Sequence, residues 1–106
     1  MNDQEFNLRF REYKETNGMM ALEHYIGPKG DVIVNSVTSD TITLLEVDSR
    51  ELCEVTTTEF KKSYVWIAYD EMQIYMTTDA AQLAALSAGH QRIVQAQLHC
   101  LNLKVT

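Results

Sequence analysis

The chain has 106 residues, 45% of them hydrophobic and 23% charged, and a formal net charge of −6. This length and composition indicate one folded domain and exclude a disordered chain. No apolar run approaches the roughly 20 residues that a membrane-spanning helix needs, and the first residues lack the basic-then-apolar plan of a signal peptide. We therefore expect a cytoplasmic protein of one domain, residues 1–106.

The negative charge is concentrated in the middle of the chain. Residues 1–39 carry a net charge of −2, residues 40–79 carry −6, and residues 80–106 carry +2. An acidic surface repels the phosphate backbone of nucleic acids and attracts basic partners. The alternative is that the acidic residues only keep a small protein soluble.

A first helix is predicted over residues 1–17. Phe6, Phe10 and Tyr13 recur at the i, i+4 and i+7 positions of one helix face, with charged residues on the other faces. Gly18 follows as a helix stop, because glycine tolerates the left-handed conformation at a helix C-terminus.

A β-meander is predicted over residues 30–77. Residues 19–26 fit either a short strand or a helical turn, and residues 27–30 read as a loop because they contain proline and two glycines. Alternating apolar residues and intervening turns then predict strands over 31–38, 41–47, 50–56, 65–69 and 72–77, with one helical turn over 57–64.

Alternation in the first of these strands places Val32 and Val34 on one face and Ile33 and Val37 on the other. Trp66, between Val65 and Ile67, is expected at the core or its edge. Sequential short strands between two helices predict an α+β fold. The meander fits a small SH3-like barrel, or alternatively an open sheet with both helices packed on one face.

A long final helix is predicted over residues 78–103, with Arg92 as its only charge between Asp79 and Lys104. One stripe of this helix combines apolar and polar residues, among them Leu83, Leu86, His90, Val94, Gln97, Leu98 and Leu101. This stripe packs either on the sheet of its own chain or against the same helix of a second copy, as an oligomerisation seam with His90 and Gln97 fixing the register. The opposite face, rich in alanine and glutamine, is a docking surface for a partner protein or for a homodimer.

Catalytic signatures are missing from the sequence. It contains no phosphate-binding loop, no dinucleotide fingerprint, no nucleophile elbow and no zinc-protease motif. Cys53 is flanked by Glu51 and Glu54, whose charges raise a thiol pKa, and the histidines and Cys100 lack metal-ligand spacing. We expect no enzyme activity, no cofactor and no metal site.

The acidic residues of the meander are therefore the leading candidates for a partner-binding surface. They are Glu46, Asp48, Glu51, Glu54 and Glu59. In size, acidity and lack of catalytic motifs, the chain resembles small accessory or inhibitor proteins of bacteriophages and mobile elements, including anti-defence proteins. This resemblance rests on no family motif. It implies a non-enzymatic protein that binds another protein and inhibits or occludes it, in the host cytoplasm if it is phage-encoded.

A second function class stays open at this stage. An SH3-like barrel can bind a small molecule, a nucleotide or a nucleic acid through exposed aromatic residues, here Tyr64, Tyr69 and Tyr75. The negative charge around these residues argues against nucleic acid as the ligand. We expect no membrane partner.

Overall fold

The computed structural model describes residues 3–67 and 88–103. The helices and strands follow one another as α1 (Asp3–Asn17), β1 (His24–Gly27), β2 (Gly30–Val37), β3 (Thr41–Glu46), β4 (Leu52–Thr56), α2 (Thr57–Ser63), β5 (Val65–Ile67) and α5 (Ala88–Asn102). The first helix, the three meander strands over 31–56 and the helical turn that follows them are confirmed. The predicted strand 72–77 and the first part of the final helix, 78–87, lie outside the described residues.

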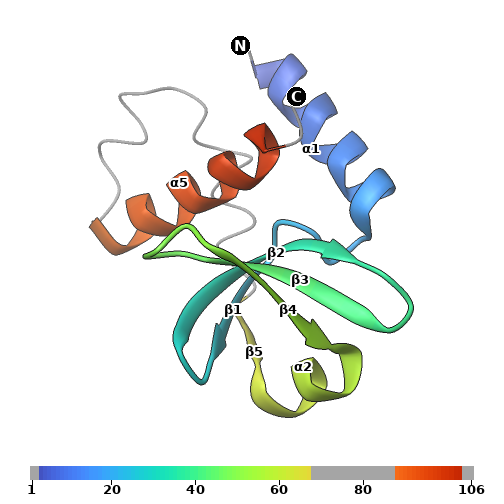
Figure 1. Cartoon of the computed structure of the whole chain (residues 1–106). Helices are drawn as coiled ribbons and strands as arrows, with labels where there is room; N and C mark the ends of the chain where they lie inside the picture. Colours follow the sequence, from blue (N-terminus) through green and yellow to red (C-terminus); the bar gives the residue numbers. More distant parts are fainter. Residues whose placement is uncertain (1–2, 68–87, 104–106) are drawn as a thin grey trace.

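The strands form one antiparallel sheet in the order β4-β3-β2-β1-β5. The sheet is open, with β4 and β5 at its edges, so the open-sheet alternative is confirmed and the described strands do not close into a barrel. Helices α1 and α5 cover one face, and α2 lies on the other (Figure 1). The ambiguous segment before residue 27 supplies β1, which pairs with both β2 and β5.

A β-bulge changes which residues share a face of β2. Val34 pairs with Leu44, but the next pair is Ser36 with Thr43, so Asn35 is an extra residue. Val37 is therefore opposite Ile42, on the same face as Val34, and the simple alternation predicted from the sequence is wrong for this residue. The Tyr13 hydroxyl, from α1, donates to the Asn35 carbonyl oxygen at 2.8 Å and so fixes the bulge to the helix.

The larger hydrophobic core lies between the sheet and the pair α1 and α5. It combines Phe10 and Tyr13 of α1, sheet residues such as Ile33 and Leu45, and one side of α5; the α5 members are Ile93, Val94, Ala96, Cys100 and Leu101. Gln97 is fully buried among them, and its Nε2 donates to the Leu22 carbonyl oxygen at 2.7 Å. The described residues of the predicted stripe, Val94, Gln97, Leu98 and Leu101, thus pack on the sheet of their own chain.

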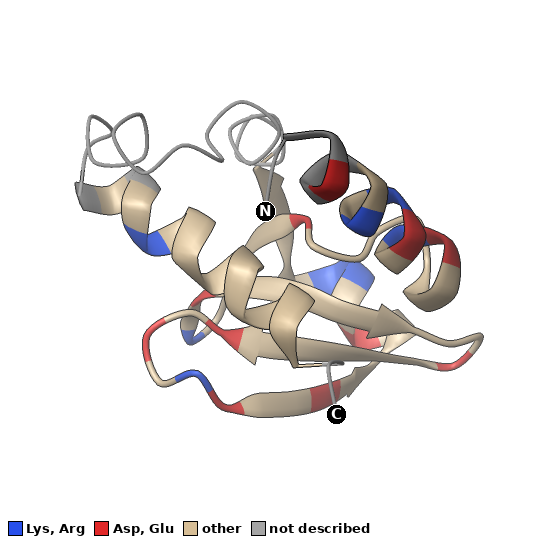
Figure 2. Ribbon diagram, turned by 90° about the horizontal axis from the view of Figure 1, so that it is seen from above, with Lys and Arg blue, Asp and Glu red and all other residues tan. Residues whose placement is uncertain are grey.

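A charged network ties α5 to the sheet beside this core. Arg92 of α5 donates to the Asp31 carboxylate and, at 2.8 Å, to Asp48, while His24 Nε2 donates to Asp31 at 2.8 Å. Arg92 is the only Lys, Arg, Asp or Glu within Ala88–Asn102 of α5. Helix α1, by contrast, carries both blue and red segments (Figure 2). Arg50 adds a hydrogen bond to the Gln95 carbonyl oxygen at 3.0 Å.

The second, smaller core lies on the α2 face of the sheet. Thr56 caps α2, because its Oγ1 accepts a hydrogen bond from the Glu59 amide at 3.1 Å. Phe60 is 4% exposed and packs edge-on against Tyr25, with ring centroids 4.6 Å apart. Tyr64 stacks on Phe60 at 5.1 Å and 16°. Trp66, by contrast, is 51% exposed on the edge strand β5 and lies at the edge of the structure, not in its core.

Gly27 allows Tyr64 to lie on the end of β1. A methyl group added at Gly27 would overlap the Tyr64 ring, whereas one added at Gly89 meets nothing within 4 Å. We predict that Gly27→Ala displaces Tyr64 and lowers the free energy of unfolding by about 1–3 kcal/mol, as overpacking does. Gly89→Ala, in α5, is the control and should leave stability equal or higher, because alanine favours helix. Urea denaturation of both variants measures the difference; equal stability of Gly27→Ala and wild type would contradict the packing described.

Asp31 gives the fold a defined acid sensitivity. Burial alone would raise the pKa of its carboxyl, but hydrogen bonds and charge from Arg92 and His24 outweigh burial and hold the pKa below its ordinary value. A carboxyl with a lowered folded-state pKa adds stability above its unfolded pKa, and this stability disappears as the pH falls through the folded value.

We predict that Asp31→Asn is less stable than wild type at pH 7, and that the gap narrows as the pH falls below about 4. Urea unfolding across pH 2–7 measures this gap. Asp40→Asn, at an exposed turn position, is the control and should show a small gap at every pH. A constant gap for Asp31→Asn would show that the ion pair does not stabilise the fold.

Candidate functional site

A cavity of about 320 Å³ opens on the α2 face of the sheet, where the β1–β2 turn, β3, β4 and α2 meet. Its walls combine carboxylates, a thiol, a phenol and one lysine; they are formed by Pro28, Lys29, Gly30, Asp31, Val32, Glu46, Cys53, Glu54, Val55, Glu59 and Tyr64. Because these residues come from the β1–β2 turn and from β2, β3, β4 and α2, the cavity exists only in the folded chain.

Two of the predicted acidic residues face this cavity. Glu46 ends β3 opposite Val32, on the α2 face, and Glu59 lies in the first turn of α2. Burial raises the pKa of the Tyr64 hydroxyl, and the charges of Cys53, Glu59 and Glu46 add to the increase. Both carboxylates are therefore close enough to act on Tyr64, and Tyr64 stays a hydrogen-bond donor at neutral pH.

Each of the two carboxylates already accepts one hydrogen bond from its own segment. Ser63 Oγ donates to Glu59 Oε1 at 2.8 Å, and Ser49 Oγ donates to Glu46 Oε2 at 3.3 Å. These bonds orient the side chains, and a carboxylate can accept about four hydrogen bonds in all. The site thus presents oriented acceptors with remaining capacity for a ligand that donates.

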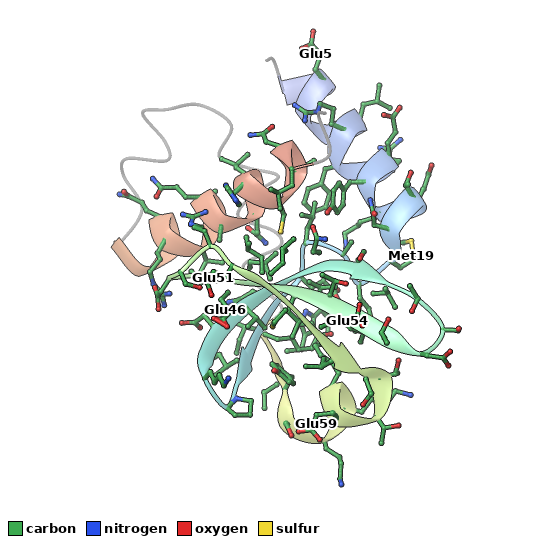
Figure 3. All side chains as sticks on the ribbon, in the orientation of Figure 1. Glu5, Met19, Glu46, Glu51, Glu54 and Glu59 are labelled. Atoms are coloured by element: carbon green, nitrogen blue, oxygen red, sulfur yellow. The ribbon has the colours of Figure 1, made fainter. Side chains whose placement is uncertain are left out.

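The other three predicted acidic residues are placed differently. Glu54 borders the cavity, but its neighbours in β4, Cys53 and Val55, pack on the α2 face. Because side chains alternate along a strand, the Glu54 side chain points to the other face of the sheet. Asp48 is bound to Arg92 of α5. Glu51 is exposed beside the β3–β4 turn and outside the cavity wall. Figure 3 shows Glu59 on α2, well separated from Glu51.

The cysteine in the wall is a poor nucleophile. Burial raises the pKa of the Cys53 thiol, Glu46 raises it further, and Lys29 partly offsets the increase. A thiol held protonated at neutral pH does not attack a substrate. Lys29 is itself part of the cavity wall, so the wall carries positive as well as negative charge.

A second cavity, of about 230 Å³, lies on the other side of Tyr64. It is mainly apolar, with one lysine at its edge; its walls are Met20, Tyr25, Val37, Ile42, Thr57, Phe60, Lys61 and Tyr64. The Oγ1 atom of Thr57 is buried and has no hydrogen-bond partner within the described part of the chain. Tyr64 is a wall of both cavities, so the two lie next to each other.

Of the residues predicted for oligomerisation, some belong to the core of one copy and others lie outside the described residues. Val94, Gln97 and Leu101 are at most 5% exposed and belong to the core of one copy, and Leu98 packs against that core. Val94, Gln97 and Leu101 are thus used within the core of one copy, whereas Leu98 is only partly buried. Leu83 and Leu86 lie outside the described residues, as does the side chain of His90. Assembly into a homodimer stays a prediction.

The aromatic residues of the alternative function are also divided. Tyr64 lies between the two cavities, while Tyr69 and Tyr75 lie outside the described residues.

Over residues 3–67 and 88–103, no three His, Cys, Asp or Glu side chains gather in a metal-binding group. Within the same ranges no helix has the length and apolar character that crossing a membrane requires.

Comparisons with protein families, with curated proteins and with solved structures found no match to this chain.

Sequence reasoning missed the cavity itself and the residues that shape it. Gly27, Lys29 and Tyr64 come together only because β1 pairs with both β2 and β5. The available signals were the glycines on both sides of Pro28-Lys29, and the spacing of Phe60 and Tyr64 on one helix face. Neither signal tells which acidic residues face these aromatic side chains.

Proposed function

We propose that this protein binds a basic segment of another protein in the acidic cavity and acts by occluding that segment, without catalysis. The observation that carries the proposal is the convergence of Glu46 and Glu59, from β3 and α2, on the wall that also holds Tyr64. The resemblance to small phage and mobile-element inhibitors fits this mode of action and is part of the proposal.

A guanidinium or ammonium group is the ligand that this chemistry favours. Carboxylates accept charge-assisted hydrogen bonds, which are shorter and stronger than neutral ones, and arginine can bind them with two donors at once. An aromatic ring beside them can add a cation–π contact. Partial enclosure strengthens the attraction relative to open water.

The charge of the cavity argues against the other ligand classes named above. Nucleic acids and nucleotides carry phosphates, which Glu46 and Glu59 repel. Among the described residues, Lys29 is the one cation in the wall, and it is exposed at the β1–β2 turn. The raised pKa of the Cys53 thiol supports a binding role for the cavity over a catalytic one.

The test is binding of a fluorescein-labelled nine-residue peptide of alternating arginine and glycine, followed by fluorescence anisotropy at low salt. We predict that the double variant Glu46→Gln/Glu59→Gln binds this peptide about tenfold more weakly than wild type, since two partly screened ion pairs are lost. Binding should also weaken as salt is added.

The matched control is Glu12→Gln/Glu51→Gln, which changes net charge by the same amount at two exposed residues that do not line the cavity. It should change affinity less than about twofold. Circular dichroism melts confirm that both double variants are folded. Equal losses in the two variants would mean that the peptide follows net charge and does not use the cavity, which would overturn the proposal.

A further inference from the structure

The apolar cavity beside the acidic one restricts the kind of segment that fits this face. Met20, Tyr25, Val37, Ile42 and Phe60 form its walls, and no carboxylate borders it among the described residues. Such walls accept an aliphatic or aromatic side chain, whose transfer from water is favourable in proportion to the apolar area buried. The acidic cavity on the other side of Tyr64 accepts a cation.

We propose that the partner segment is an extended peptide that presents a basic side chain to the acidic cavity and a large apolar side chain to the apolar one. This inference rests on the function proposed above and specifies its ligand. Charge complementarity determines which peptide residue enters which cavity. Glu46 and Glu59 bind the basic residue, and the apolar cavity around Phe60 binds the apolar residue.

The separation of the two cavities sets the spacing of the two side chains. Glu46 borders the acidic cavity, and Ile42, four residues earlier in β3, borders the apolar one. Four steps along a strand span about 13 Å, and residues four apart in an extended peptide also point to the same side. The basic and apolar residues of the partner should therefore be about four positions apart.

The experiment is a selection from random nine-residue peptides displayed on phage, with the immobilised full chain as bait. A second pool contains overlapping peptides of this chain's own sequence. The proposal predicts enrichment of peptides with arginine or lysine and, three to five positions away, leucine, isoleucine, methionine or an aromatic residue. Synthetic versions of one enriched peptide should then lose about tenfold or more in affinity when the apolar residue becomes alanine.

The outcomes separate this inference from the function it rests on. Enriched peptides that are basic but have no apolar residue at a fixed spacing would overturn the inference and leave the acidic cavity as a binding site. Enrichment without basic residues, or no enrichment at all, would overturn both. Selection of this chain's own peptides would assign the face to a second copy and overturn the inference. In the Glu46→Gln/Glu59→Gln variant, replacing the arginine of the peptide should matter little, whereas replacing the apolar residue should still weaken binding.

Discussion

The contact between Tyr64, Phe60 and the backbone of Gly27 is the constraint on which the α2 face depends. Phe60 holds the short helix on the sheet by packing edge-on against Tyr25, and Tyr64 stacks on Phe60 and lies across the end of β1, where only glycine leaves room. A helix of seven residues is not stable by itself, so α2 keeps its position through these aromatic contacts and its threonine cap. The position of Glu59, and the division of this face into an acidic and an apolar cavity, both follow from where Tyr64 lies.

The two faces of the sheet differ in how their residues are used. The face under α1 and α5 holds the larger core, and beside this core Arg92 forms ion pairs with Asp31 and Asp48. The α2 face holds a smaller core, and its carboxylates border a cavity where they are paired only with neighbouring serines among the hydrogen bonds described. Helix α5 therefore stabilises the fold by packing on the sheet. The face around α2 is the better candidate for binding a partner.

Most of the local structure could be predicted from the sequence, because apolar periodicity and turn residues are local signals. The first helix, the meander over β2 to β4, the helical turn at α2 and the helix over α5 all follow from such patterns. Two kinds of feature could not be predicted. The bulge at Asn35 moves Val37 to the other face, and its contact with the fold is a hydrogen bond from Tyr13, 22 residues away. The separation of Glu46 and Glu59 from Asp48, Glu51 and Glu54 depends on strand register and on a partner in α5, so five acidic residues that look equivalent in the sequence differ in the fold.

The most direct test of the central claim is an NMR titration of the ¹⁵N-labelled chain with the arginine–glycine peptide. If the acidic cavity is the binding site, the largest amide shifts will fall on Glu46, Cys53, Glu59 and Tyr64, and the amides of Asp48 and Glu51 will shift little. Largest shifts on Asp48, Glu51 or α1, or small shifts spread evenly over the acidic surface, would contradict the account, because either result would mean that the cavity around Tyr64 does not select the basic ligand.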